Sequence, residues 1–296
     1  MTKTNSEFLS CQQTICFPVD VTGVGLHTGQ PIHMRLLPAG PGSGVIFRRV
    51  DLKKTVDIPA HMAYVGCTRL CTTLENSGQR VATVEHLLSA VRGLGIDNLM
   101  VEIDGPEIPI MDGSAAPFVF VLQSAGVLKQ KAVRKYIVIK EPIEVKDDEG
   151  KAFCRLLPYQ GFKLDFNIQF DHPSFTKKNQ HATLDVYKGS YTVDICRART
   201  FGFVEQMEYL KKNNLARGAS LENAIGLDNE SILNQDGLRY HDECVKHKIL
   251  DAIGDLSLLG TSIIGAFEGF CSGHKMNKML MDRVMTQSYA WEEIAT

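Results

Sequence analysis

The segment KQKAVRK, residues 129–135, places four basic side chains among seven residues and separates two stretches of apolar sequence. Residues 118–122 before it are continuously apolar, and residues 136–139 after it have the composition of a β-strand. A chain of 296 residues is also long enough for two hydrophobic cores, because single cores stop growing near ~250–300 residues. We therefore predict a first domain over residues 1–128, a linker over residues 129–135 and a second domain over residues 136–296.

Both predicted domains contain β-sheet. Apolar and polar residues alternate from Leu99 to Ile103 in the first domain, and a longer alternation in the second puts five apolar side chains on one face. These five are Phe162, Leu164, Phe166, Ile168 and Phe170. Each domain also has one strongly amphipathic helix late in its sequence. Strands followed by helices favour an α+β fold over a parallel βαβ fold.

The first amphipathic helix is predicted to begin with Thr83 as its N-cap and to end near Gly93 and Gly95. Its apolar stripe comprises Val84, Leu87, Leu88 and Val91. At about 100° per residue, His86 falls opposite that stripe and Glu85 at its edge. Both side chains are therefore expected to face water or the other domain rather than the core that this helix buries.

The second amphipathic helix is predicted over residues 242–258. Its apolar side comprises Val245, Ile249, Ile253 and Leu256. The opposite side carries His247, Asp251 and Asp255, and Lys248 lies beside them. An imidazole, two carboxylates and an ammonium group therefore share the face that is turned away from the core.

The composition excludes several classes of protein. Hydrophobic residues make up 44% of the chain and charged residues 22%, which is typical of globular proteins. The net charge of −2 provides no global field that would attract nucleic acid, so no nucleic-acid partner is expected. The longest apolar stretch, residues 256–267, is shorter than the ~20 residues that span a bilayer, so no integral membrane span is expected.

The N-terminal sequence and the cysteines bear on the compartment. Residues 2–7 are polar and no apolar signal segment follows them, so we expect a cytoplasmic protein. The eight cysteines are then expected to be reduced thiols, and no C-x-x-C pair suggests a cysteine-based zinc site. The glycine-rich stretch 23–29 does not match the nucleotide-binding motif G-x-G-x-x-G, because Thr28 occupies the sixth place. A turn carrying His27 is predicted there instead.

One group of polar residues has the spacing for metal chemistry. His247 and Asp251 are one helical turn apart, which brings their Cβ atoms within ~6 Å, close enough for both to bind one metal ion. Glu85 and His86 could supply the base and the third ligand of a catalytic zinc site. Such spacing is more often that of a weak surface pair, and the H-E-x-x-H signature of many zinc hydrolases is absent. Spacing alone therefore leaves the question open.

Longer motifs identify a family. TVEHL at residues 83–87, PEIPIMDGSAAPF at 106–118 and HKILDAIGDL at 247–256 closely resemble the UDP-3-O-acyl-N-acetylglucosamine deacetylases of Gram-negative bacteria. Three shorter motifs match in the expected order: GVGLHTG at 23–29, RARTFGF at 197–203 and SGH at 272–274. The resemblance therefore covers nearly the whole chain.

The resemblance implies a zinc-dependent deacetylase that removes the N-acetyl group from an acylated UDP-sugar and releases acetate, the committed step of lipid A biosynthesis. It implies that His86, His247 and Asp251 bind Zn²⁺, with Fe²⁺ as an alternative metal in the cell. It also implies a monomer, located in the cytoplasm with transient contact to the inner membrane surface. The fold of the family is two similar α+β lobes, each a sheet layered against helices, with the active site between the lobes.

The resemblance further implies a role for each remaining motif residue. Glu85 is expected to be the general base for the attacking water, and His274 the general acid that protonates the departing amine. Asp255 would keep His274 charged, and Thr200 would stabilise the developing oxyanion. Residues expected to contact the substrate are Leu26, His27, Phe201 and Lys248, and the acyl chain is expected to occupy an insertion over about residues 202–227.

Two positions depart from the family. Leu157 stands near a position where family members often carry a basic residue, so that phosphate contact is not carried over, and Ala219 replaces a common second glycine. From the residues, two other functions stay open. One is a zinc hydrolase acting on another amide, and the other is a non-catalytic metal-bridged binding protein in which Glu85 is only a first-turn carboxylate.

Overall fold

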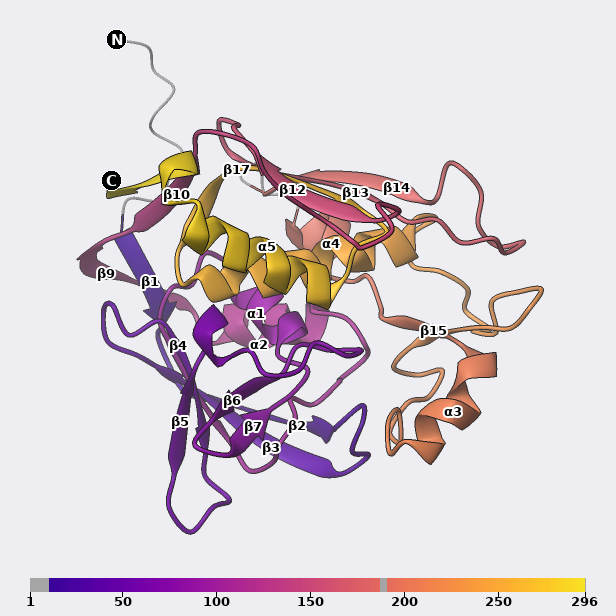
Figure 1. The fold of residues 1–296 in the computed structure, drawn as a ribbon. Coiled ribbons are helices and arrows are strands. Elements are labelled where there is room, and N and C mark those ends of the chain that lie inside the picture. The colour runs from indigo at the N-terminus through magenta and orange to yellow at the C-terminus, as the bar shows by residue number, and fades with distance from the viewer. Residues whose placement is uncertain (1–10, 187–190, 296) are drawn as a thin grey trace.

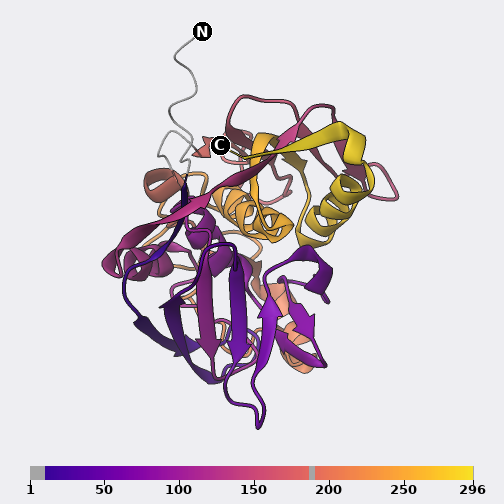
Figure 2. The ribbon, with the colours of Figure 1, turned by 90° about the vertical axis from the view of Figure 1, so that its left-hand side faces the viewer.

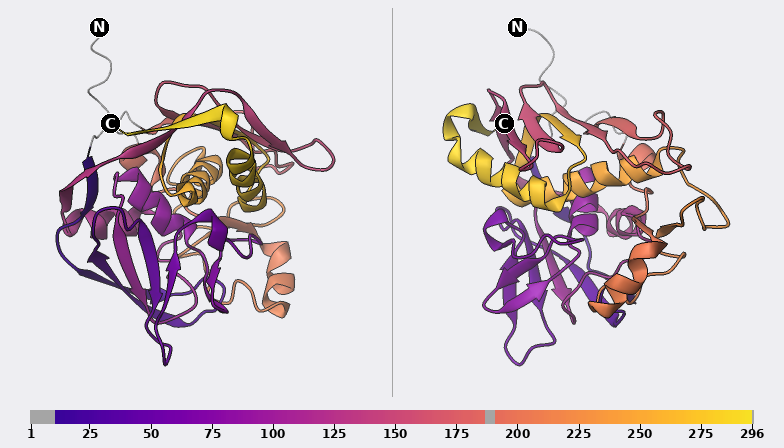
Figure 3. Two further views of the ribbon diagram at one scale, coloured as in Figure 1. Left: turned by 60° about the vertical axis from the view of Figure 1, so that its left-hand side comes forward. Right: turned by 45° about the vertical axis from the view of Figure 1, so that its right-hand side comes forward.

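The computed structural model describes residues 11–186 and 191–295, and it has the mixed α+β architecture that the sequence predicts. Two main sheets lie on the outside and the four longest helices lie between them (Figure 1). The views in Figures 2 and 3 agree on this arrangement. The helices of the two halves therefore face one another across the middle of the molecule.

The first sheet has five strands in the order β2-β3-β8-β4-β5, and only the β4–β8 pair is parallel. Its strands are β2 (Val19–Val24), β3 (Pro31–Pro38), β4 (Val45–Arg49), β5 (Val56–Pro59) and β8 (Leu99–Ile103). Alternate side chains of β3 and β8 are buried, because one face of this sheet packs against the helices α1 (Glu85–Gly93) and α2 (Ala116–Ser124). A separate hairpin is formed by β6 (Leu74–Asn76) and β7 (Gln79–Val81).

The second sheet has seven strands, with β11-β12-β17-β10-β18 along the main path and β13 and β14 beside β17. Its strands are β10 (Lys135–Ile139), β11 (Ile143–Lys146), β12 (Phe153–Leu157), β13 (Phe162–Asn167), β14 (His181–Asp185), β17 (Ser262–Phe270) and β18 (Trp291–Ala295). The predicted alternation is confirmed in β13, where Phe162, Leu164 and Phe166 are buried. The helices α4 (Glu243–Leu256) and α5 (His274–Thr286) cover its inner face (Figure 3).

The segment predicted as a linker contributes to strands. Residues 129–133 belong to β9 (Val127–Val133), which pairs antiparallel with β1 (Cys11–Ile15), and Lys135 begins β10. Arg134 between these strands is buried, and its guanidinium group binds the carboxylate of Asp97. Arg134 therefore anchors the crossing from one sheet to the other.

A smaller element projects from the second half. Strands β15 (Phe201–Phe203) and β16 (Ile225–Leu227) pair in parallel, and α3 (Met207–Lys212) lies between them in the sequence. A tighter 3₁₀ turn, Val204–Gln206, leads into α3. Figure 1 shows α3 standing away from both main sheets.

The first amphipathic helix begins one residue later than predicted, so the assignment of Thr83 as its N-cap is wrong. Val84 is the N-cap, and Thr83 has a left-handed backbone conformation with φ of 57°. The left-handed backbone keeps Thr83 out of the N-cap position, and its hydroxyl donates to Glu107 Oε1 at 3.1 Å. Glu107 is buried and also accepts the backbone N–H groups of His27 and Thr28, so it links Thr83 to the loop after β2.

The cysteines and the membrane prediction can also be compared with the structure. Within the described residues, which include every cysteine, no two cysteines are joined by a disulfide, as predicted. Each helix of residues 11–186 and 191–295 is too short or too polar to span a bilayer.

Candidate functional site

The candidate site forms where α1 and α4 cross. Glu85 and His86 lie in the first turn of α1, and His247 and Asp251 lie one turn apart on α4. The helices cross at Gly254, where an added Cβ would lie 2.1 Å from the carbonyl oxygen of Glu85. Only glycine allows the backbones to approach this closely. Glu85 and His86 were expected to face either water or the other half, and the structure buries both against the other half.

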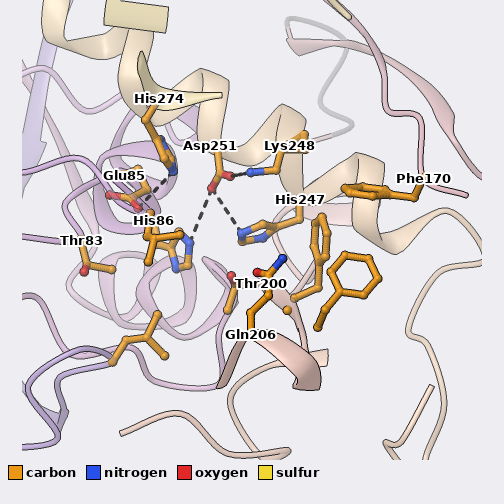
Figure 4. A pocket seen from close by; sticks show the side chains of 15 residues that line it. Thr83, Glu85, His86, Phe170, Thr200, Gln206, His247, Lys248, Asp251 and His274 are labelled. Carbon is orange, nitrogen blue, oxygen red and sulfur yellow. Dashed lines mark hydrogen bonds and ion pairs between the residues drawn. The ribbon is translucent and has the colours of Figure 1, made fainter. Parts of the chain in front are cut away.

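Three side chains converge at one point (Figure 4). Asp251 Oδ1 lies 3.6 Å from His86 Nε2 and 3.3 Å from His247 Nε2, and one ligand atom from each of the three residues lies within 4.8 Å of the other two. The two imidazole rings meet edge to face with centroids 4.9 Å apart. The structure thus brings together the three residues expected to bind a metal ion.

The protonation of these residues suits a divalent cation. His247 Nδ1 lies 3.0 Å from the carbonyl oxygen of Ala198, which can only accept, so Nδ1 carries the proton and Nε2 is left with its lone pair. Burial lowers the pKa of His247 to about 3, although the charge of Asp251 opposes this, so the ring is neutral at neutral pH. Neutral imidazole is the form that binds metals.

Asp251 provides the negative charge of this cluster. Burial alone would raise its pKa, but His247 and Lys248 outweigh burial and hold the pKa of Asp251 well below its usual range. Its Oδ1 is buried and accepts no hydrogen bond from the described residues, while Oδ2 accepts from Lys248 Nζ at 2.8 Å. A cation between Oδ1 and the two Nε2 atoms would satisfy this unpartnered oxygen, so the residues present fit a metal ion.

A second cluster lies beside the first. His274 is the first residue of α5, and its Nε2 lies 3.7 Å from Glu85 Oε1. On the other side of the ring, His274 Nδ1 lies 2.8 Å from Asp255 Oδ2, and Asn277 Nδ2 donates to the same oxygen. The predicted pairing of Asp255 with His274 is therefore present in the structure.

This second cluster holds an acid and a base with unusual pKa values. Burial raises the pKa of Glu85, and the charges of His274 and His86 reverse only part of that rise. Burial would lower the pKa of His274, but Asp255 and Glu85 outweigh it and raise that pKa to about 9. At neutral pH His274 is therefore an imidazolium ion next to a carboxylate that can take up a proton.

The pocket around both clusters has a volume of about 280 Å³. Besides the two clusters it is lined by Leu26, Thr200, Phe201 and Lys248, which the resemblance identifies as site residues. Lys248 Nζ lies 5.8 Å from the centre of the Phe201 ring, within reach of a cation–π contact. A second pocket of about 530 Å³ shares Leu70 and Gln206 with the first and runs along α3.

His27 does not line the pocket, although we expected it to contact the substrate. Its Nδ1 accepts the backbone N–H of Ala216, and its carbonyl oxygen accepts that of Arg217. Burial lowers its pKa despite the carboxylate of Glu107. In this structure His27 therefore connects the loop after β2 to the segment that follows α3.

Sequence reasoning missed several residues at the site. Leu70, Phe170, Phe203 and Gln206 line the pocket, and Thr72 contacts both Glu85 and Asp255. Leu70 and Thr72 lie in a loop, Phe203 ends β15 and Gln206 lies in a 3₁₀ turn, where no periodic pattern indicates which way a side chain points. Phe170 follows the end of β13, so the alternation that predicted it on the apolar face of a strand does not extend to it. Only the excess of aromatic residues between 170 and 203 was visible as a signal.

A buried cluster of two histidines and an aspartate, next to a carboxylate and a histidine in a pocket, is typical of metal-dependent hydrolases. Comparison with known proteins gives the particular family. Residues 12–286 match the model of the UDP-3-O-acyl N-acetylglycosamine deacetylase family, and the chain belongs to this family.

Individual relatives are similar over almost their full length. A UDP-3-O-acyl-N-acetylglucosamine deacetylase of Saccharophagus degradans is 53% identical over 96% of this chain and 93% of the relative. A protein of the same name from Coxiella burnetii is 52% identical over 95% of this chain and 92% of the relative. One from Legionella pneumophila is 52% identical over 93% of this chain and 90% of the relative. The motif resemblance is thereby confirmed.

Proposed function

We propose that this protein hydrolyses the N-acetyl amide of a UDP-3-O-(3-hydroxyacyl)-N-acetylglucosamine and releases acetate, in the committed step of lipid A biosynthesis. The observation that carries the proposal is the convergence of His86, His247 and Asp251 next to Glu85 and His274. The names of the relatives supply the substrate class.

His86, His247 and Asp251 would hold the metal ion, which we propose to be Zn²⁺, with Fe²⁺ as an alternative in the cell. When bound, such an ion supplies a Lewis acid that polarises the amide carbonyl and lowers the pKa of water. The hydrogen bond from His247 Nδ1 to Ala198 fixes the ring so that Nε2 faces the ion.

Glu85 acts as the general base in this proposal. Its carboxylate takes a proton from the water that attacks the amide carbon, and its raised pKa makes it a stronger base than an exposed glutamate. His274 acts as the general acid and gives its Nε2 proton to the amine as the carbon–nitrogen bond breaks. Proton uptake at Glu85 and release at His274 leave the protein with unchanged total charge.

The remaining pocket residues would bind and orient the substrate. The Thr200 hydroxyl would donate to the carbonyl oxygen as negative charge develops there. Lys248, held by Asp251, presents a cation for hydroxyl or diphosphate oxygens of the UDP-sugar. The second pocket along α3 is lined by Tyr209, Leu210 and Leu215 and would take the acyl chain.

Metal analysis together with Glu85→Gln tests the proposal. We expect about one divalent ion per chain in both proteins and a loss of acetate release of about 10²–10⁴-fold in the variant, which is the usual contribution of general-base catalysis. A binding protein without catalysis would release no acetate in either form. Wild-type rates in Glu85→Gln would rule out Glu85 as the base.

A second comparison tests the substrate. The acylated UDP-sugar and plain UDP-N-acetylglucosamine differ only by the acyl chain, which the second pocket would bury. We expect kcat/KM to be at least 100-fold higher for the acylated compound, since each buried methylene contributes about 0.8 kcal/mol. Equal values would indicate a hydrolase of another amide.

A further inference from the structure

The loop that precedes β6 places one threonine against both catalytic carboxylates. The backbone N–H of Thr72 donates to Glu85 Oε2 at 3.0 Å, and its hydroxyl donates to Asp255 Oδ1 at 2.6 Å. Thr72 is only 2% exposed. Neither the motifs nor the names of the relatives assign a role to this residue.

These contacts close a ring of four residues. Thr72 binds Glu85, Glu85 Oε1 lies 3.7 Å from His274 Nε2, His274 Nδ1 binds Asp255 at 2.8 Å, and Asp255 binds Thr72. Two of the residues come from the first half of the chain and two from the second. The ring therefore connects the proposed base and the proposed acid through Thr72 and Asp255.

The Thr72 hydroxyl completes the set of hydrogen bonds that Asp255 accepts. Asp255 Oδ2 already accepts from His274 and Asn277, so the Thr72 hydroxyl is the donor to the other oxygen, Oδ1. A buried carboxylate with three donors is held in one orientation, and its two oxygens cannot exchange places. The fixed Asp255 faces His274 Nδ1 and directs Nε2 toward Glu85 and the pocket.

The main chain of Thr72 is held as firmly as its side chain. Its carbonyl oxygen accepts the N–H of Val84, the N-cap of α1, and Thr73 N–H donates to the carbonyl of Cys67. The loop therefore moves with the first turn of α1, which carries Glu85. Any shift of α4 relative to α1 would stretch the contact between Thr72 and Asp255.

We propose that Thr72 is a positioning residue, whose hydroxyl holds Asp255 so that His274 and Glu85 keep the relative orientation that amide hydrolysis requires. This inference rests on the proposed function for its kinetic consequence. Its structural part, the effect of the hydroxyl on His274, does not depend on which substrate is hydrolysed.

The test uses Thr72→Val, which keeps the shape and the backbone N–H but removes the hydroxyl, and Thr72→Ser, which keeps the hydroxyl. In the metal-loaded protein we expect kcat to fall at least tenfold in Thr72→Val with KM changed less than twofold, because loss of such outer partners costs about 10–100-fold. Thr72→Ser should restore kcat to within threefold of wild type. Metal content should be unchanged, because Thr72 contacts no metal ligand.

Thr73→Val is the matched control. Thr73 is the neighbouring buried threonine, and its hydroxyl contacts only the Cys71 sulfur, at 3.8 Å, among the hydrogen bonds of the described residues. It should keep kcat within twofold of wild type. Thr72→Ala removes the same hydroxyl without a buried methyl group, and should show the same loss of kcat if Thr72→Val does not fold.

A spectroscopic readout separates this inference from the proposed function. The Nδ1–H proton of His274 should give a downfield NMR signal that is missing in His274→Gln, moves in Thr72→Val and stays in place in Thr73→Val. If wild type releases no acetate but this pattern is seen, the proposed function is wrong and the positioning role stands. An unmoved signal in Thr72→Val, or wild-type kcat in it, would overturn the inference, as would a Thr72→Ser variant as slow as Thr72→Val.

Discussion

Gly254→Ala is expected to move His86 away from His247 and Asp251 without unfolding the protein. The new Cβ would lie 2.1 Å from the carbonyl oxygen of Glu85, whereas real Cβ atoms stay at least 3.0 Å away. Because the obstructing atom is backbone, no side-chain rotation relieves the contact. The helices α1 and α4 must move apart by about 0.9 Å, which is several times the ~0.2 Å over which metal–ligand distances vary.

The effect on stability should be smaller than the effect on metal binding. Overpacking costs ~1–3 kcal/mol, and replacing a glycine inside a helix by alanine returns ~1 kcal/mol. We therefore expect the free energy of unfolding of the metal-free protein to fall by about 0–2 kcal/mol. Metal affinity should fall at least tenfold, because His86 moves with α1 while His247 and Asp251 move with α4.

Competition with a chelator of known affinity measures the metal binding, and denaturant unfolding of the metal-free protein measures the stability. Gly40→Ala is the control, because a Cβ at Gly40 meets no atom within 4 Å. It should leave both quantities within error of wild type. A Gly254→Ala protein with wild-type metal affinity would refute the reasoning that this close approach sets the distance between the ligands.

Three further predictions concern the charges around the site. Glu243→Gln breaks the buried pair with Arg199 at 2.9 Å and should lower the free energy of unfolding by ~3–5 kcal/mol, measured with denaturant. Asp255 and Glu85 raise the pKa of His274 to about 9, although burial opposes this rise. The pair of His274 with Asp255 therefore stabilises the fold fully below about pH 6.5 and loses this effect as the pH rises through about 9. Asp255→Asn should therefore cost more stability at pH 6 than at pH 10 in denaturant titrations, and an equal cost would contradict the assignment. Lys248→Met should raise KM for the acylated UDP-sugar about tenfold in steady-state assays with the metal content unchanged, whereas an unchanged KM would exclude a contact with the substrate.

Much of the fold could be predicted because it depends on periodic patterns. The alternation in β8 and β13 is set by burial of one face, and such burial is visible in sequence. The apolar stripe of α4 was also visible, although the structure buries the polar side of this helix as well. The start of α1 was mispredicted because it depends on a distant partner. Thr83 has the sequence signature of an N-cap, but its backbone is left-handed and its hydroxyl donates to the buried carboxylate of Glu107. No local pattern reports such a distant contact.

The site could be predicted in part for the same reason. The faces of α1 and α4 identified Glu85, His86, His247 and Asp251 as polar groups outside the core, but spacing could not show that they meet. The motif resemblance supplied His274 and Thr200. Neither route found Thr72, whose two contacts cross the chain to Glu85 and Asp255 from a loop without periodicity.

The crossing of α1 and α4 has a consequence for how the protein is made. Glu85 and His86 leave the ribosome long before α4 and α5, so the nascent first half carries a carboxylate and a helix that α4 and α5 have not yet covered. A chain that ends before α4 lacks two of the three residues proposed to hold the ion, and one that ends before α5 lacks the proposed acid. Under the proposed function, activity would therefore appear late, in chains whose last helices have docked.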